Sequence, residues 1–327
     1  MAEKTRWGIL GPGGIARRFA DAVGNVPHAT LMAVGSRTQE RAESFGKEFD
    51  IPNRHGSYEA LAQDPEVDAI YVSTPHPMHK DAVLLAFEGR KAVLCEKPLT
   101  VTESETNTLI AAAREQNCFL MEAMWTRFLP SITKVRELIA DNAIGEVRMV
   151  KADFGFRAGF DPKGRLFAPE LAGGGLLDVG VYNVSFASML LGEPEEVTSA
   201  AQLGETGVDE QCSLVLKYAQ GELAVLNSAV RTTMSNDAWV FGTEGRIYID
   251  APWYGGTCFT LMRDGKDAEW FEEPIQGNGF EYQIHEVRKC LDAGRLESAI
   301  LPLDESAAVM RTMDRARAQW GLRYPFE

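Results

Sequence analysis

Short apolar runs alternate with stretches of helical periodicity over the first third of the 327-residue chain. Runs that predict strands lie at residues 7–10, 30–34, 67–72, 92–95 and 119–121, and helical periodicity lies between them at residues 15–23, 39–49, 79–88 and 103–116. Strands and helices in regular alternation are typical of βαβ units, whose strands pair in parallel. The pattern therefore predicts a Rossmann domain, a doubly wound parallel sheet of roughly five or six strands.

The pattern changes after Trp125. A helical stretch at residues 131–140 precedes strands joined by turns, and two further helices close the chain; these elements lie at residues 147–154, 212–218, 223–227, 281–293 and 306–320. Strands of this kind are typical of antiparallel sheets. We expect a dinucleotide-binding Rossmann domain at residues 1–124 and an α+β domain with a mostly antiparallel, open-faced sheet at residues 125–327.

Charge and composition exclude several classes of partner. The formal net charge of -14 and the pI near 5.0 disfavour binding to nucleic acid or to an anionic membrane surface. We expect no apolar run to approach the ~20 residues of a membrane-spanning helix, and the polar residues 1–6 are unlike a secretory signal, so we expect a cytoplasmic protein. The cysteines are scattered without a C-x-x-C pair, which predicts reduced thiols and no metal site; they are Cys95, Cys118, Cys212, Cys258 and Cys290.

A glycine-rich loop follows the first predicted strand and opens the first predicted helix. Its residues, which match G-x-G-x-x-[GA], are Gly11, Pro12, Gly13, Gly14, Ile15 and Ala16. Gly11 permits a tight turn, Gly13 lets the backbone approach a pyrophosphate, and the small Ala16 lets the helix pack closely while its N-terminal amides attract the anion. The loop predicts dinucleotide binding, and the alternative is a simple strand-to-helix turn.

The end of the second predicted strand distinguishes the two nicotinamide dinucleotides. An acidic residue there would bind the ribose 2′-hydroxyl of NAD, but the sequence instead has Ser36, Arg37 and Thr38, with Arg41 one helical turn further on. Two guanidinium groups and neighbouring hydroxyls suit a 2′-phosphate, which favours NADP. The alternative is that Arg41 is solvated and Arg37 only stacks on adenine, in which case NAD remains open.

Two further loops follow the fourth and fifth predicted strands. The first contains Thr74, Pro75, His76 and His79, and the second begins with Glu96 and Lys97. Both loops lie at the carboxyl ends of parallel strands, where open α/β sheets bind ligands, so we expect all six residues to contact the cofactor. The two histidines have no evident third ligand, and we therefore predict no metal.

A third chemical element is the segment G-G-G-L-L-D-V-G-V-Y, which begins at Gly173. Asp178 and Tyr182 are four residues apart in this segment, so on a helix they would share one face.

These motifs together resemble the glucose-fructose oxidoreductase and inositol dehydrogenase (Gfo/Idh/MocA) family. The resemblance rests on the glycine loop, the Glu96-Lys97-Pro98 segment and the Gly173–Tyr182 segment. E-A-M-W-T-R-F at residues 122–128 and E-T-G-V-D at residues 205–209 are similar to the branch of dimeric dihydrodiol and NADP-dependent D-xylose dehydrogenases. Most family members have histidine where Tyr182 stands, and tyrosine matches this branch and the glucose-fructose oxidoreductase branch.

The resemblance implies a catalytic group of Lys97, Asp178 and Tyr182, and a cis Lys97-Pro98 bond. When an alcohol carbon gives up a hydride, its oxygen must lose a proton, and a free phenol with a pKa of ~10 is a poor base at neutral pH. The Lys97 ammonium would stabilise the phenolate of Tyr182. Asp178 would orient either Lys97 or the substrate hydroxyl, and the sequence leaves both roles open.

Aromatic residues are the candidates for the substrate site, because aromatic faces suit a flat diol ring or the C–H face of a sugar. We select Trp125, Phe154, Trp253 and Phe280, from a wider set that includes Phe156 and Tyr254. The resemblance also implies a homodimer that covers the open face of the antiparallel sheet.

The sequence thus predicts an NADP-dependent dehydrogenase that transfers a hydride between the nicotinamide and a secondary alcohol or hemiacetal of a sugar or cyclic diol. One alternative is an NADPH-dependent reductase of a keto sugar such as 1,5-anhydrofructose, which would use the same residues in the opposite direction. The other is a non-catalytic regulatory protein that senses NADPH. Such a sensor would have no need of Lys97, Asp178 and Tyr182, all of which are present.

Overall fold

The computed structural model describes residues 4–327, and these residues form two compact units. The first unit contains the chain through Trp125 together with Gln276–Ser306, and the second contains Thr126–Ile275 and Ala307–Glu327. A single boundary after residue 124 was predicted, so the assignment of residues 276–306 to the second domain needs correction. This segment groups with the first unit because its helix packs on the first helix of the chain.

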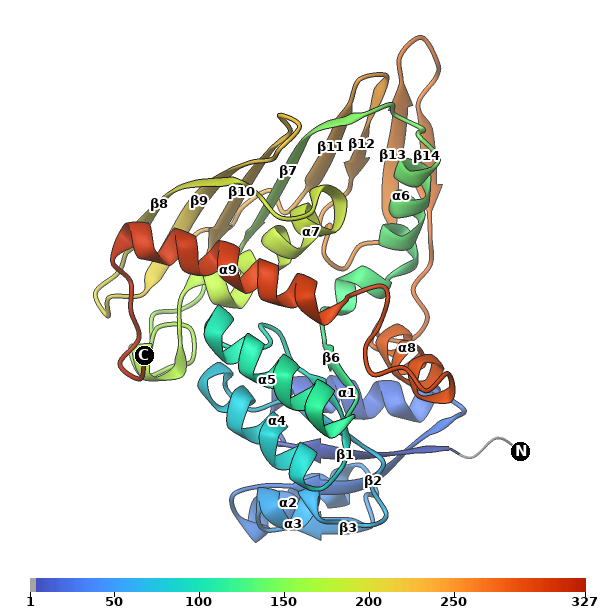
Figure 1. Ribbon diagram of the computed structural model, residues 1–327, viewed down its shortest axis with the longest axis vertical. Coiled ribbons are helices and arrows are strands. Elements are labelled where there is room, and N and C mark those ends of the chain that lie inside the picture. Colours follow the sequence, from blue (N-terminus) through green and yellow to red (C-terminus); the bar gives the residue numbers. More distant parts are fainter. Residues whose placement is uncertain (1–3) are drawn as a thin grey trace. The chain divides into compact units, whose positions relative to one another are not determined.

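The first unit is built on a parallel six-stranded sheet with the order β3-β2-β1-β4-β5-β6 (Figure 1). Its strands are β1 (Thr5–Leu10), β2 (Ala29–Gly35), β3 (Asn53–His55), β4 (Ala69–Val72), β5 (Ala92–Cys95) and β6 (Leu120–Glu122). Every residue of β4 and β5 is buried, which explains why they appear in the sequence as continuous apolar runs. The strand order reverses between β1 and β4, the point where dinucleotides bind such sheets. The predicted fold of this half is confirmed.

In the described part of this unit, six α-helices accompany these strands, and three of the six begin at a capping side chain. They are α1 (Gly14–Asn25), α2 (Gln39–Glu48), α3 (Tyr58–Ala62), α4 (His79–Glu88), α5 (Glu103–Gln116) and the returning α8 (Glu281–Asp292). Thr38, Ser57 and Thr102 accept a backbone N–H at the starts of α2, α3 and α5. Helix α1 begins instead at Gly13, with no side-chain cap and no acidic residue in its first turn.

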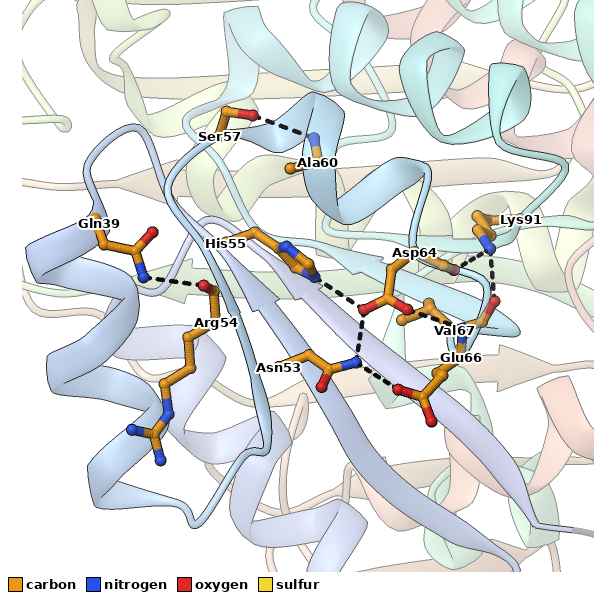
Figure 2. A network of polar contacts seen from close by, with 10 residues as sticks. All are labelled: Gln39, Asn53, Arg54, His55, Ser57, Ala60, Asp64, Glu66, Val67 and Lys91. Carbon is orange, nitrogen blue, oxygen red and sulfur yellow. Dashed lines mark hydrogen bonds and ion pairs between the residues drawn. The ribbon is translucent and has the colours of Figure 1, made fainter.

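The edge strand β3 was not predicted, because its three residues, Asn53, Arg54 and His55, are polar. Figure 2 shows what holds it in place. The carboxylate of Asp64 accepts a hydrogen bond from Asn53 Nδ2 at 2.8 Å and lies 2.9 Å from His55 Nε2. Lys91 Nζ donates to the backbone oxygen of Asp64 at 2.6 Å. This network fixes β3 beside the end of β2, where the backbone N–H of Ser36 donates to His55 O at 3.0 Å.

The second unit is built on an eight-stranded sheet with the order β14-β13-β12-β11-β7-β10-β9-β8. Its strands are β7 (Val147–Gly155), β8 (Glu196–Leu203), β9 (Asp209–Lys217), β10 (Leu223–Ala229), β11 (Ala238–Gly242), β12 (Gly245–Ile249), β13 (Cys258–Arg263) and β14 (Glu269–Glu272). Strands β7 and β10 pair in parallel, and the other pairings are antiparallel. Buried and exposed residues alternate along β9, as expected for a sheet with one face on a core. The predicted antiparallel architecture is confirmed.

Helices cover the inner face of this sheet. They are α6 (Pro130–Ala140), the π-helical turn η4 (Leu176–Gly180), α7 (Val181–Leu191) and most of α9 (Leu303–Trp320). Helix α7 packs on β7 and β10 (Figure 1). Contrary to the expectation from the sequence, the segment Pro169–Leu191 is long and apolar enough to cross a membrane, but 83% of its most apolar stretch is buried inside the structure. We interpret it as a core helix of the second unit.

Candidate active site

The glycine loop leaves open space at the start of α1. Gly11 has a φ of +93°, and a side chain there would press against Thr74, 3.1 Å from its Cγ2. By contrast, a Cβ on Gly13 would come no closer than 4.0 Å to any neighbour, and a Cβ on Gly14 would meet nothing within 4 Å. The uncapped amides of α1 therefore open onto a space that a pyrophosphate can enter. Ala16 is fully buried, as close packing of α1 requires, and Ile15 is half-buried.

The loop after β4 supplies a polar atom that fits a bound dinucleotide. Thr74 is 7% exposed, and among residues 4–327 its Oγ1 has no hydrogen-bond partner. A buried hydroxyl of this kind normally pairs with another group. Pro75 is exposed and His76 half-buried beside it. The open glycine loop and this hydroxyl together fit a dinucleotide.

Two arginines stand at the end of β2. Arg37 and Arg41 are exposed, and within the described part of the chain neither forms an ion pair with a carboxylate. Burial raises the pKa of the Tyr58 phenol, and the positive charges of the two arginines partly offset this increase. Ser36 is buried, and the hydroxyl of Thr38 caps α2 by accepting from the backbone N–H of Arg41 at 3.4 Å. Two guanidinium groups are therefore exposed at the end of β2, with the acidic Glu40 between them.

Glu96 supports the loop that carries Lys97. Its carboxylate, 7% exposed, accepts a short hydrogen bond from the hydroxyl of Tyr71 and another from the backbone N–H of Lys97 at 3.3 Å. Burial raises the pKa of Glu96, and the ammonium of Lys97 opposes this. Tyr71 is itself stacked on Phe19 of α1, with ring centroids 3.9 Å apart. The Lys97-Pro98 peptide bond is cis, as the resemblance implied.

His79 differs from its predicted role. Its ring is fully buried, with Nδ1 2.9 Å from the backbone oxygen of Pro98 and Nε2 2.9 Å from that of Thr74. Burial lowers the pKa of His79, and the two carbonyl groups oppose this. Because both ring nitrogens are engaged by backbone, His79 joins the two loops and does not present a nitrogen to the cofactor.

Glu122 is a supporting residue that sequence reasoning missed. Its carboxylate is 3% exposed and accepts from the backbone N–H of Leu99 at 3.0 Å and from the hydroxyl of Ser306 at 2.6 Å. It therefore holds the far end of the Lys97 loop. Its position at the start of the distinctive 122–128 segment was the signal that could have found it.

Within residues 4–327, no group of three or more histidine, cysteine, aspartate or glutamate residues is arranged to hold a metal ion.

In the second unit, Asp178 lies in the π-helical turn that leads into α7, so the simple α-helical spacing used to pair it with Tyr182 was an approximation. Turns of this type occur frequently at functional sites. The side chain of Asp178 is 8% exposed and forms a short ion pair with Arg165, whose side chain is 63% exposed. Arg165 was not predicted, because it lies in an irregular loop between β7 and η4.

Tyr182 lies in a cluster of three aromatic rings. It meets the ring of Phe154 edge to face at 5.3 Å, and Phe154 stacks on Tyr254 at 3.6 Å. The centroids of Tyr182 and Tyr254 are 6.0 Å apart, and burial raises the pKa of Tyr254. The structure thus brings Phe154 and Tyr182 together as predicted candidates, and adds Tyr254 to them.

Trp253 lies in the core beneath Tyr254, and its prediction as a substrate residue needs correction. It is fully buried, packs on Phe186 with centroids 4.8 Å apart, and donates from Nε1 to the backbone oxygen of Asp153 at 3.1 Å. These are the contacts of a core residue. Its neighbour Tyr254 is the residue that stacks on Phe154.

The other two aromatic candidates lie together in the first unit. Trp125 and Phe280 have centroids 5.4 Å apart, and the guanidinium of Arg18 lies over both rings, at 5.3 Å and 4.8 Å. Phe280 is 1% exposed and Trp125 is half-buried. Together with Arg18 on α1, they form a rigid cation–π group.

Helix α7 is fixed on the sheet by close contacts. A Cβ on Gly180 would lie 2.7 Å from the hydroxyl of Ser228, so glycine is needed for this approach. Asn183 Nδ2 donates to the backbone oxygen of Asn227 at 2.8 Å. The buried Arg127 donates to the backbone oxygen of Ser185 at 2.9 Å and is structural.

Comparison with known proteins identifies the family. The family model described as "Oxidoreductase family, NAD-binding Rossmann fold" matches residues 5–124, and the model described as "GFO/IDH/MocA C-terminal domain" matches residues 132–248. The chain belongs to the Gfo/Idh/MocA oxidoreductase family. Trans-1,2-dihydrobenzene-1,2-diol dehydrogenases from Xenopus tropicalis and Mus musculus are 40% and 38% identical to it. Each alignment covers 98% of this chain, and 99% and 98% of the respective relative.

Solved structures agree with this membership. Aldose-aldose oxidoreductase from Caulobacter crescentus matches with a TM-score of 0.88 at 29% identity, over 98% of this chain and 99% of that chain. The 3-ketoreductase KijD10 from Actinomadura kijaniata, solved with NADP and TDP-benzene, matches with a TM-score of 0.86 at 26% identity, over 97% and 98%. This Gfo/Idh/MocA protein is therefore an NAD(P)-dependent oxidoreductase, as the sequence predicted.

Proposed function

We propose that the protein is an NADP-dependent dehydrogenase that transfers a hydride between the nicotinamide and a secondary alcohol or hemiacetal carbon of a cyclic diol or sugar. The observation that carries the proposal is the aromatic cluster around Tyr182, which places a phenol beside the flat face of Phe154 and Tyr254. This arrangement suits a ring bearing hydroxyl groups. Full-length similarity to diol dehydrogenases supports it.

In the proposed reaction, bound NADP supplies the hydride acceptor. The phenolate of Tyr182 accepts the proton of the substrate hydroxyl, and the carbon that bears this hydroxyl gives its hydride to the nicotinamide. One proton and one hydride thus leave the alcohol. The ammonium of Lys97 stabilises that phenolate, since an opposite charge favours the charged form. Asp178 accepts a hydrogen bond from a second substrate hydroxyl, a role that its ion pair with Arg165 supports.

Spectrophotometry tests the chemistry directly. Absorbance of the reduced nicotinamide would be followed with NADP and a panel of dihydrodiols, cyclitols and aldoses, for wild type, Lys97→Ala and Tyr182→Phe. Each variant should lose about 10²- to 10⁴-fold in kcat, the usual contribution of a general base, while the Kd for NADP changes little. Tyr248→Phe, which removes a hydroxyl elsewhere in the second unit, is the matched control. Wild-type turnover in both variants would exclude this mechanism.

The preference for NADP is the second part of the proposal. Arg37 and Arg41 would bind the 2′-phosphate, and the 3-ketoreductase that matches in structure was solved with NADP. Arg37→Ala and Arg41→Ala should each weaken NADP binding by about 10- to 100-fold and leave the Kd for NAD nearly unchanged, because charge-assisted hydrogen bonds contribute ~1.5–3 kcal/mol. Arg246→Ala removes an exposed guanidinium from β12 and is the control. A wild-type preference for NAD would contradict this assignment.

Two other functions give different results in the same assay. Similarity to a 3-ketoreductase favours reduction of a keto sugar such as 1,5-anhydrofructose as the second candidate. That activity would appear as NADPH oxidation with keto sugars and weak turnover of all alcohols. Tight NADPH binding with no turnover in either direction would indicate a nucleotide-sensing protein instead.

We further propose a homodimer that covers the outer face of the eight-stranded sheet. This face carries apolar side chains, among them Val215 and Trp270, which are 42% and 62% exposed. Trp239 stacks on Phe241 on the same face. Light scattering should give a mass near twice 36.0 kDa, and Trp270→Asp should shift it toward the monomer. A monomeric wild type would refute the dimer.

A further inference from the structure

The segment Glu205–Asp209 forms the tip of the hairpin between β8 and β9. The backbone N–H of Gly204 donates to Val208 O at 2.9 Å, and that of Gly207, which has a φ of +85°, donates to Gly204 O at 3.0 Å. This turn places Asp209 as the first residue of β9, where it is fully buried. The segment stood out in the sequence, yet neither the cofactor nor the substrate assignment uses it.

The carboxyl group of Asp209 holds the start of the helix that carries the proposed catalytic residues. Its Oδ2 accepts a hydrogen bond from the backbone N–H of Leu176 at 2.6 Å. Gly174 has a φ of +124°, and a Cβ on it would collide with Asp209 Oδ1, while a Cβ on Gly175 would lie 3.4 Å from Oδ2. The glycine-rich turn is therefore shaped to admit this side chain.

Two other contacts fix the same turn. The hydroxyl of Tyr324 donates to the backbone oxygen of Gly173 at 2.7 Å, and the backbone N–H of Gly174 donates to Leu166 O at 2.9 Å. Tyr324 is 3% exposed, and the guanidinium of Arg317 lies 5.1 Å from its ring centroid. The turn is thus held by three separate segments of the second unit before the helix begins.

We propose that Asp209 is a positioning residue, whose hydrogen bond to the amide of Leu176 sets the places of Asp178 and Tyr182. These residues follow Leu176 by two and six positions in one continuous helical segment, so a movement of its first residue displaces both. A misplacement of about 1 Å can cost on the order of 10² in rate. The inference rests on the proposed function, in which Asp178 and Tyr182 act on the substrate.

The surroundings of Asp209 indicate that an uncharged side chain can also accept the hydrogen bond from Leu176. Burial raises the pKa of Asp209 to about 7, opposed by the amides of Leu176 and Gly175 and by the guanidinium of Arg317. The other titratable neighbours are Cys212 on β9 and Tyr324. Either protonation state keeps an oxygen that accepts from Leu176. Asparagine, which also keeps an acceptor, should therefore preserve the position of the helix.

Two measurements on Asp209→Ala and Asp209→Asn test the inference. The first is amide hydrogen exchange in residues 173–182, and the second is kcat, KM and the Kd for NADP with a turned-over substrate. Asp209→Ala should speed exchange in this segment and lower kcat by about 10²-fold, with KM and the NADP Kd within about 3-fold of wild type. Asp209→Asn should restore both exchange and kcat to within about 5-fold. Tyr218→Phe, which removes a buried hydroxyl just after β9, is the control and should change neither.

Contrary results would be clear. Unchanged exchange and kcat in Asp209→Ala, or a loss in Asp209→Asn as large as in Asp209→Ala, would overturn the positioning role. If Asp209→Ala fails to fold, Tyr324→Phe removes one hydrogen bond from the same turn and should speed exchange there with a smaller loss of kcat. Wild-type exchange and wild-type kcat in Tyr324→Phe would then overturn the inference. Faster exchange in Asp209→Ala combined with full turnover in Tyr182→Phe would support the holding of the helix and refute the catalytic assignment alone.

Discussion

Replacing Asp209 by asparagine should remove a pH dependence from the stability of the protein. The pKa of this carboxyl rises from 3.8 to about 7 on folding, because burial penalises the charged form. The folded state therefore binds the proton more tightly than the unfolded state at intermediate pH. Stability from this group is fully present below about pH 4 and is lost as the pH rises through about 7.

The size of the effect follows from the two pKa values. Each pH unit between them changes the free energy of unfolding by about 1.4 kcal/mol, so the whole window amounts to about 4 kcal/mol. Most of it falls between pH 4 and pH 7, and little change is expected above pH 8. Asp209→Asn cannot ionise, so the difference in stability between wild type and this variant should follow the window.

Urea unfolding, followed by tryptophan fluorescence at pH 5, 6, 7 and 8, measures this difference. Wild type should lose stability relative to Asp209→Asn by about 3 kcal/mol between pH 5 and pH 8. The control is Asp68→Asn, which removes a carboxyl whose pKa is lowered in the folded state, because hydrogen bonds from the side chain and backbone of Arg6 outweigh the opposing effect of burial. Its difference from wild type should stay flat over this range and change only in acid. A flat difference for Asp209→Asn would refute the reasoning.

Four further substitutions have distinct expected results. Tyr254→Ala should raise KM about tenfold, measured by steady-state kinetics, because it opens the aromatic cluster. Trp253→Phe should leave KM unchanged and lower the free energy of unfolding in urea by about 1–3 kcal/mol, because the carbonyl of Asp153 loses its hydrogen-bond donor. Arg165→Gln should reduce kcat/KM for a diol about tenfold yet change stability by less than about 1 kcal/mol, since the guanidinium is 63% exposed; equal kinetics in the variant would show that its ion pair with Asp178 has no part in turnover. His79→Leu removes a ring that lies 2.9 Å from two buried carbonyl oxygens, of which a neutral imidazole donates to one, and should cost about 1–3 kcal/mol in urea unfolding, together with weaker NADP binding by titration.

The parallel half of the fold could be predicted because its signals are local. A strand buried on both faces is a continuous apolar run, and the glycine loop between β1 and α1 marks the strand-to-helix turn. Strand β3 escaped detection because polar residues form it and a tertiary network holds it. The return of residues 276–306 to the first unit depends on the packing of α8 on α1, which no sequence pattern encodes.

The candidate site likewise contains residues that could be identified from the sequence and residues that could not. Gly11, Arg37 and Lys97 could be selected because each lies at the end of a predicted strand within a recognisable motif. Arg165 and Tyr254 could not, because their importance comes from the residues they contact. Trp253 and Tyr254 are adjacent aromatic residues, and only the tertiary structure shows which of them packs into the core.

Buried polar side chains hold the backbone next to the proposed reactive groups. Glu96, His79 and Glu122 hold backbone atoms of residues 97–99, and Asp209 holds the backbone at Leu176. Loops and glycine turns have backbone donors and acceptors that no strand or helix pairs, and leaving them unpaired in the interior would cost about 1–3 kcal/mol each. Buried polar side chains satisfy these groups and at the same time fix the backbone in a single position, which apolar packing alone does less specifically. The groups that make such turns stable in the interior are thus the same groups that set where Lys97, Asp178 and Tyr182 are presented.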